Sequence, residues 1–201
     1  MVLGVTGKYC AGKSTLAEIL TDEYGFLEID VDKLGHRALE EKAEEILSAF
    51  GPEVAASASQ TGPAGSIDRR KLGDIVFSDK EALQRLEGIV HPVMRAEVLR
   101  FIDSHPGKEI VVNAAVLFTM RLEELCDAVI MVDAPVFIRI RRARNRDNLS
   151  LLQVIRRFTS QRNLGLQSAA GDVDIYTVYN DGDRAALGRE VALILDKEGY
   201  P

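Results

Sequence analysis

The chain has 201 residues, 46% of them hydrophobic and 28% charged, with a formal net charge of −6. This length and composition predict one globular domain, and the acidic balance argues against nucleic-acid binding through bulk charge. Two cysteines, Cys10 and Cys126, do not suggest a disulfide framework, which fits a reducing cytoplasm. The chain begins with a predicted core strand rather than a signal peptide, and no apolar run is long enough to span a bilayer.

The first predicted strand, residues 2–6, leads into a glycine-bounded loop and then a helical pattern. This loop has the spacing G-x-x-x-x-G-K-[ST], which is typical of phosphate binding between a strand and a helix. Its glycines let backbone N–H groups approach a polyphosphate, and the helix adds its positive dipole end. Lys13 is expected to reach the β- and γ-phosphates of ATP, and the Ser14 hydroxyl is expected to ligate Mg²⁺. The residues of the predicted ATP-binding loop are Gly7, Lys8, Tyr9, Cys10, Ala11, Gly12, Lys13, Ser14 and Thr15.

The next elements are a helix predicted over residues 12–23 and a second strand over 26–30. This strand delivers Asp30 and Asp32 at its C-terminal end, which is the edge of an open α/β sheet where ligands bind. If the strand continued, the two carboxylates would face the same way. One of them could instead cap the following helix, predicted over 33–50. The residues alone leave open which carboxylate works in the site.

A helical insertion is predicted between the second and third strands. It follows a loop, residues 51–65, that is rich in Ala, Ser, Gly and Pro. Asp68 and Asp79 are predicted N-caps of two helices. Pro92 is expected to break or kink the second helix, which resumes after it. His91 is a candidate catalytic base, although a local hydrogen-bonding role is the favoured interpretation.

The remaining pattern predicts three more strands and a closing helix. Residues 110–117 form a near-continuous apolar run, as in a buried parallel strand, and 128–133 form the next. Asp133 is either a Walker-B-like carboxylate or a strand-end cap. The last strand is predicted over 174–179 and the final helix over 184–197. This order predicts a doubly wound, three-layer α/β fold with about five parallel strands.

An arginine-rich segment separates the fourth strand from the fifth. Eight of the 17 arginines lie within residues 139–162. Arg139, Arg142 and Arg146 share one helical face at the spacing i, i+3, i+7. Such a run is often a solvated face, but arginine forms forked contacts with phosphate and stabilises the charge of phosphoryl transfer. We therefore expect a lid over ATP, completed by a second helix over 149–162.

The other motifs separate the classes of P-loop protein. A GTPase requires a base-reading Asn-Lys-x-Asp, which is not in the sequence. The segment Asp32-Lys33-Leu34-Gly35 matches the switch-like D-x-x-G pattern, but it follows the second strand, so we treat the match as chance. A small chain with an early strand-end carboxylate, a helical insertion and an Arg-rich lid indicates a small-molecule kinase. Its chemistry requires positioning, charge neutralisation and a group that accepts the hydroxyl proton.

Taken together, these motifs resemble the dephospho-CoA kinase family, which phosphorylates the ribose 3′-hydroxyl of dephospho-CoA to make coenzyme A. The sequence Ile29-Asp30-Val31-Asp32 looks like the family's Ile-Asp-Ala-Asp, whose second Asp is taken as the base. The resemblance assigns this role to Asp32. Arg142 and Arg146 fall at the paired lid arginines, and Asn180 resembles the family's Asn near the adenine.

The resemblance also implies a complete set of site residues and a division of the chain. Catalytic roles fall on Asp32, Lys13 and Arg142, with ATP and Mg²⁺ as cofactors. Dephospho-CoA would be bound by Asp32, Asp68, Arg69 and His91. One P-loop kinase domain is implied, in the cytoplasm, without nucleic-acid or membrane partners and with the oligomeric state open. Its parts are a core (1–30, 108–134 and 172–201), a helical substrate region (31–107) and an Arg-rich helical lid (135–165).

Two segments depart from the family pattern. Lys8, Tyr9, Cys10 and Ala11 replace a loop with more Gly that carries Ile and Ser. The segment from Ala115 to Thr119 replaces Pro-Leu-Leu-Phe-Glu, so the family's Glu is lost at Thr119. Two alternatives therefore stay open: another nucleotide or metabolite kinase with a changed acceptor, and a non-catalytic nucleotide-binding regulator.

Overall fold

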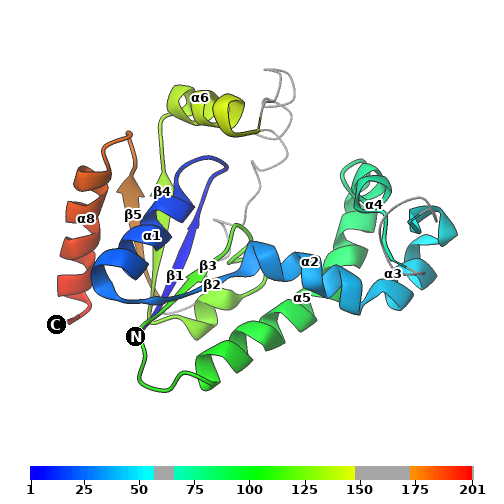
Figure 1. The fold of residues 1–201 in the computed structure, drawn as a ribbon, viewed down its shortest axis with the longest axis horizontal. Helices are drawn as coiled ribbons and strands as arrows, with labels where there is room; N and C mark the ends of the chain where they lie inside the picture. The colour runs from blue at the N-terminus through cyan, green and yellow to red at the C-terminus, as the bar shows by residue number, and fades with distance from the viewer. Residues whose placement is uncertain (57–65, 148–172, 201) are drawn as a thin grey trace. The chain divides into compact units, whose positions relative to one another are not determined.

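The computed structural model describes residues 1–56, 66–147 and 173–200. It divides into two compact units, one formed by residues 1–31 and 101–201 and the other by 32–100. The first contains the β-sheet, and the second is helical (Figure 1). Among the described residues, no helix combines the length and the apolar character that a membrane span requires.

The first unit is built on a five-stranded sheet in which every pair of neighbouring strands is parallel. The strand order is β2-β3-β1-β4-β5. This arrangement confirms the predicted α/β class and the number of strands. The strands are β1 (Val2–Gly7), β2 (Leu27–Asp30), β3 (Ile110–Asn113), β4 (Ala128–Asp133) and β5 (Asp174–Tyr179).

The central strand, β1, carries the phosphate-binding loop at its C-terminal end. It pairs with β3 on one side and with β4 on the other. Because all the strands are parallel, their C-terminal ends meet at one edge of the sheet. In register, Gly7 pairs with Val132, and Asp30 pairs with Asn113. The loop therefore begins at the point where the strand order reverses, which is the usual ligand site of an open α/β sheet.

One face of the sheet is covered by α1 (Lys13–Tyr24) and α8 (Arg184–Lys197), which contact one another. In Figure 1 these two helices lie side by side along the strands. Each fully buried aliphatic side chain contributes about 1.5–3 kcal/mol, so this packing holds α1, and with it the loop, against the sheet. The buried side chains are Leu3, Val5, Val111, Ile130, Val132 and Val178 from the strands, and Leu16, Ile19, Leu20, Leu187, Val191, Ile194 and Leu195 from the helices.

On the opposite face of the sheet, the chain after β3 differs from the prediction. The apolar run 110–117 was expected to be one strand, but β3 ends at Asn113. Residues 114–117 leave the sheet, and Leu117 is fully buried. Its side chain lies next to Gly4, on the face of the sheet away from α1. The run is therefore apolar because it packs across the sheet, and only its first half pairs with a neighbouring strand. The chain then passes through η2 (Leu122–Leu125) into β4.

The helical unit begins as α2 (Val31–Glu41) leaves the sheet. The helix predicted over 33–50 is in fact two helices, because a turn at Lys42 separates α2 from α3. Asp68 caps α4 as predicted, accepting bonds from two backbone N–H groups. An antiparallel bridge joins Ala55 to Ile67. The elements are α3 (Ala43–Phe50), η1 (Pro52–Val54), α4 (Arg69–Val76) and α5 (Lys80–Asp103).

Pro92 does not break the helix, so of the two predicted effects, a break or a kink, the break is wrong. The helix α5 is continuous from Lys80 to Asp103 with Pro92 inside it. An internal proline costs about 3 kcal/mol. Burial of Val90, Met94 and Val98, on both sides of the proline, offsets this cost at about 1.5–3 kcal/mol each.

Candidate active site

The phosphate-binding loop is tightly turned between β1 and α1. The N–H of Ala11 donates to the Lys8 carbonyl oxygen at 2.9 Å and closes a turn. Cys10 adopts φ 58° and Gly12 adopts φ 110°, both in the left-handed region. A Cβ on Gly12 would overlap the side-chain amide of Asn180. Gly12 is therefore required both by its backbone conformation and by the close approach of Asn180.

Two arginines of α6 (Val136–Asp147) hold the loop through its carbonyl oxygens. Arg139 Nε donates to the Tyr9 oxygen at 2.9 Å. Arg142 donates from one nitrogen to the Ala11 oxygen at 3.0 Å and from another to Asn180 Oδ1 at 2.9 Å. The predicted common face of these arginines therefore lies against the loop. Both side chains therefore fix the shape of the loop, whereas the sequence pattern predicted only that they contact the nucleotide.

Arg139 was expected on the lid face but was not among the predicted site residues. Its side chain is buried although it is charged. Burial lowers the pKa of Arg139, and the negative charge of Asp133 acts in the opposite direction. A charge-assisted bond to a loop carbonyl compensates this desolvation. Its position three residues before Arg142 on one helical face was the available signal.

Lys8 and Asp133 join the ends of β1 and β4. Lys8 Nζ lies 2.7 Å from Asp133 Oδ2. The other carboxylate oxygen of Asp133 accepts from the N–H of Ala134 at 2.8 Å. Both alternatives for this aspartate therefore have support, since it caps the strand end and its carboxylate lies at the phosphate loop.

A cavity of about 550 Å³ opens over the loop. Ligand pockets typically span about 300–1,000 Å³, so the space suits a nucleotide. Of the described residues that line it, four are Lys or Arg and none is acidic, which favours a polyphosphate over a cationic or neutral ligand. The lining is Lys8, Cys10, Gly12, Lys13, Ser14, Thr15, Arg142, Asn145, Asn180, Gly182 and Arg184.

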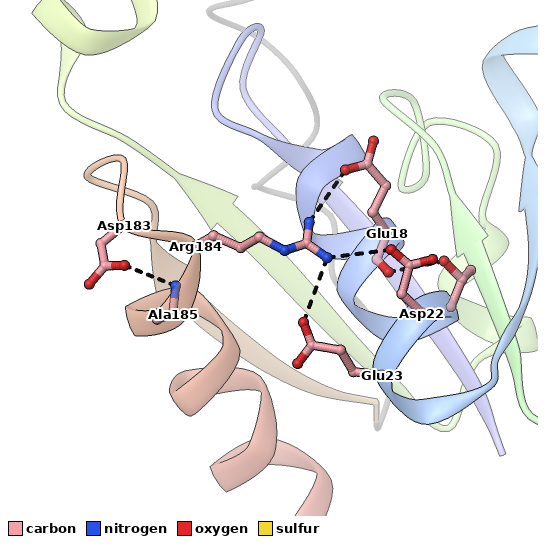
Figure 2. A network of polar contacts seen from close by, with 7 residues as sticks. Glu18, Asp22, Glu23, Asp183, Arg184 and Ala185 are labelled. Carbon is pink, nitrogen blue, oxygen red and sulfur yellow. Dashed lines mark hydrogen bonds and ion pairs between the residues drawn. The ribbon is translucent and has the colours of Figure 1, made fainter.

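Arg184, at the rim of this cavity, is anchored by acids of α1. Its guanidinium lies 3.4 Å from Glu18, 3.5 Å from Asp22 and 3.6 Å from Glu23. Figure 2 shows the three acids around the guanidinium. Asp183, which precedes it, caps α8 by accepting from the N–H of Ala185. These exposed pairs contribute little individually. Together they fix the start of α8 beside α1.

The predicted acid pair is separated by a change of secondary structure. β2 ends at Asp30 and α2 begins at Val31, so the two side chains are not alternate residues of one strand. Asp32 is exposed in the first turn of α2, where a carboxylate favours the helix dipole. Asp30 lies at the C-terminal edge of the sheet, next to β3.

The other predicted acceptor residues belong to the helical unit. Asp68 accepts from the N–H groups of Arg70 and Lys71 at 3.0 and 3.2 Å. Arg69 pairs with Glu40 at 2.9 Å. These side chains therefore have structural partners in addition to any ligand.

His91 also belongs to the helical unit and is half-buried in α5. Burial lowers its pKa, which favours the neutral imidazole. The backbone of Arg146 is helical in α6, whereas its side chain and the predicted helix 149–162 lie outside the described residues.

A phosphate-binding loop at the central strand of a parallel sheet, beneath a basic nucleotide-sized cavity, defines a P-loop nucleotide-binding protein. The family model for dephospho-CoA kinase matches residues 1–184, and the chain belongs to that family. The dephospho-CoA kinase of Borreliella burgdorferi is 32% identical over 95% of this chain and 91% of its own.

Two solved structures resemble the whole chain. The Thermus thermophilus protein TT1252 has a TM-score of 0.79 at 30% identity, covering 98% of this chain and 97% of its own. The dephospho-CoA kinase of Campylobacter jejuni has a TM-score of 0.64 at 30% identity, with 98% and 96% covered. The chain is therefore an enzyme of the kinase class with a nucleotide-binding P-loop.

Proposed function

We propose that this chain transfers the γ-phosphoryl group of ATP to the ribose 3′-hydroxyl of dephospho-CoA, giving coenzyme A and ADP. The observation that carries the proposal is the basic cavity over the P-loop in a chain of this family. The relatives named dephospho-CoA kinase support the acceptor. Neither Cys10 nor Cys126 is in a disulfide, which supports a reducing cytoplasm as the compartment.

The nucleotide is bound by the loop and the start of α1. Lys13 and Ser14 line the cavity at the helix N-terminus, where the dipole favours anions. The lysine neutralises the β- and γ-phosphates, and Asn180 borders the adenine side. Arg142 holds the loop in shape and, with Arg146, contacts the triphosphate and neutralises part of its negative charge.

The donor set also fits Mg²⁺. A hydroxyl at Ser14 and a carboxylate at Asp133 are oxygen ligands of the kind that Mg²⁺ prefers; Ser14 lies in the first turn of α1, directly after the loop, and Asp133 ends β4. When bound, the ion would neutralise charge on the β- and γ-phosphates.

Asp32 is proposed as the base that accepts the 3′-hydroxyl proton. Consecutive Cα atoms are about 3.8 Å apart, so its Cα lies within about 8 Å of Asp30, the last residue of β2. This places the start of α2 close to the sheet edge that carries the loop. Asp32 is exposed, as a group that must meet a ligand requires.

Paired substitutions separate the two acids. Asp32→Asn should keep ATP affinity and lower the single-turnover rate by a factor on the order of 10² or more, because a base is lost while the phosphate cradle stays intact. Asp30→Asn should act chiefly on stability or on Mg²⁺ placement. A slow Asp30→Asn beside a fast Asp32→Asn would transfer the role to Asp30.

The acceptor residues need variants that preserve their structural bonds. Asparagine caps helices as well as aspartate does, so Asp68→Asn keeps the cap of α4 and removes only the charge. A rise in KM for dephospho-CoA with unchanged stability would support binding by Asp68. Arg69→Met and His91→Asn are compared in the same way, with the melting temperature as the control for the helical unit.

The proposal is tested by measuring ADP release with and without dephospho-CoA, with adenosine as a second acceptor. We expect ADP release that depends on dephospho-CoA. Release that depends on another acceptor would favour a kinase of changed specificity. Nucleotide binding without turnover on any acceptor would indicate a regulator.

A further inference from the structure

Lys8 lies where two hollows of the sheet unit meet. It lines the large cavity together with Lys13 and Ser14. It also lines a smaller apolar pocket of about 30 Å³, formed by the end of β1, by Met131 and by residues of the 115–119 segment. That segment carries Thr119 where the family pattern has Glu. Lys8 therefore borders both the nucleotide cavity and the segment that departs from the family.

The backbone of Lys8 is held, while its side chain is able to move. Its carbonyl oxygen accepts from the N–H of Ala11 and closes the loop turn. Its side chain is 46% exposed and pairs with Asp133, whose carboxylate is oriented by the N–H of Ala134. An exposed ion pair contributes little to stability. A polyphosphate in the cavity can therefore draw the ammonium away from Asp133 at small cost.

We infer that Lys8 is a catalytic residue whose ammonium contacts the phosphoryl group as it passes from nucleotide to acceptor. The inference rests on the proposed phosphoryl transfer to a hydroxyl. In that step the bond between the γ-phosphorus and the β–γ bridging oxygen breaks. A bond from phosphorus to the acceptor oxygen forms, ADP leaves, and the hydroxyl proton goes to Asp32. Lys8 keeps its protons and neutralises the equatorial oxygens, which carry the charge of the transition state.

The test uses Lys8→Met, with Lys108→Met as the matched control. Lys108 is an exposed lysine just before β3, at the opposite edge of the sheet, and its replacement makes the same change of net charge. Affinities are measured by calorimetry for ADP and for ADP with aluminium fluoride, which mimics the phosphoryl group in transfer. For Lys8→Met we expect ADP affinity within about twofold of wild type. Binding of ADP with aluminium fluoride and kcat should each fall by about tenfold or more.

Two results would overturn the inference. Wild-type kcat and wild-type aluminium fluoride binding in Lys8→Met would show that the ammonium does not meet the transferred group. A lowered melting temperature, with ADP and ADP–aluminium fluoride weakened alike, would show that Lys8 only holds Asp133. Aluminium fluoride binding needs no acceptor. The affinity for ADP with aluminium fluoride, relative to that for ADP alone, therefore decides the role of Lys8 even if the wild type fails to phosphorylate dephospho-CoA. Such a failure would refute only the proposed function.

Discussion

Replacing Gly12 by alanine should distort the phosphate-binding loop, because it adds backbone strain and a steric overlap at one position. The left-handed backbone at φ 110° costs an alanine about 1–2 kcal/mol. The new Cβ would also overlap Asn180, which is buried and accepts at Oδ1 from Arg142 at 2.9 Å and from the N–H of Gly182 at 3.2 Å.

Displacing Asn180 breaks both bonds. Loss of a bond to a charged donor costs about 1.5–3 kcal/mol, and loss of a neutral one about 0.5–1.5 kcal/mol. Together with the backbone strain, Gly12→Ala should lower the free energy of unfolding by roughly 3–6.5 kcal/mol, a large part of the about 5–15 kcal/mol of a typical domain. The affinity for ADP should fall by more than about tenfold, because the distorted loop no longer directs its N–H groups, together with the N-terminus of α1, at the phosphates.

Gly25 supplies the matched control. It is also left-handed, at φ 75° after α1, but a Cβ there would meet nothing within 4 Å. Gly25→Ala should therefore lose only the about 1–2 kcal/mol of backbone strain and keep wild-type ADP affinity. Urea unfolding and calorimetric titration of ADP measure both quantities. Equal stability losses in the two variants, or unchanged ADP affinity in Gly12→Ala, would refute the reasoning.

Three further predictions concern the same cavity. Lys13→Ala should remove measurable turnover without unfolding the chain, and near wild-type activity in a steady-state assay would contradict the phosphate-site assignment. Arg142→Lys keeps the charge but loses the fork that holds Ala11 and Asn180, so kcat should fall, whereas unchanged kcat in Arg142→Ala would show that the arginine has no catalytic role. Burial raises the pKa of Cys126 to about 12, so at pH 8 only about one thiol in 10⁴ is ionised there. Alkylation followed by mass spectrometry should therefore label Cys10 alone, with protection by ATP; labelling of Cys126, or no protection, would oppose this.

The local sequence pattern predicted correctly those helices and strands whose tertiary packing favours the same structure as their local pattern. The bounds of β4, β5 and α8 are those expected from the sequence. Where tertiary burial competes with local preference, two expectations were wrong: a break at Pro92 and a single strand over 110–117. Pro92 stays within a helix because its apolar neighbours are buried, and residues 114–117 are apolar because they pack across the sheet.

The phosphate-binding loop was predictable because its spacing carries its chemistry, but its supports were not. Lys8 and Asp133 lie 125 residues apart in sequence, and Arg139 lies 130 residues from Tyr9. Such contacts depend on the strand order, which brings β4 beside β1. A local sequence pattern does not predict that order. The roles of Asp32, Asp68, Arg69 and His91 remain predictions of the resemblance.

The most direct test of the proposed activity is the regiochemistry of a single turnover. The wild-type chain is mixed with ATP, Mg²⁺ and dephospho-CoA, and the product is analysed by mass spectrometry and by phosphorus–proton correlated NMR. A parallel reaction uses the 3′-deoxy analogue of dephospho-CoA. We predict one added phosphoryl group, coupled to the ribose 3′-proton, and no product from the 3′-deoxy analogue. Phosphorylation of that analogue, a phosphoryl group at any other position, or ATP hydrolysis without transfer would contradict the proposal.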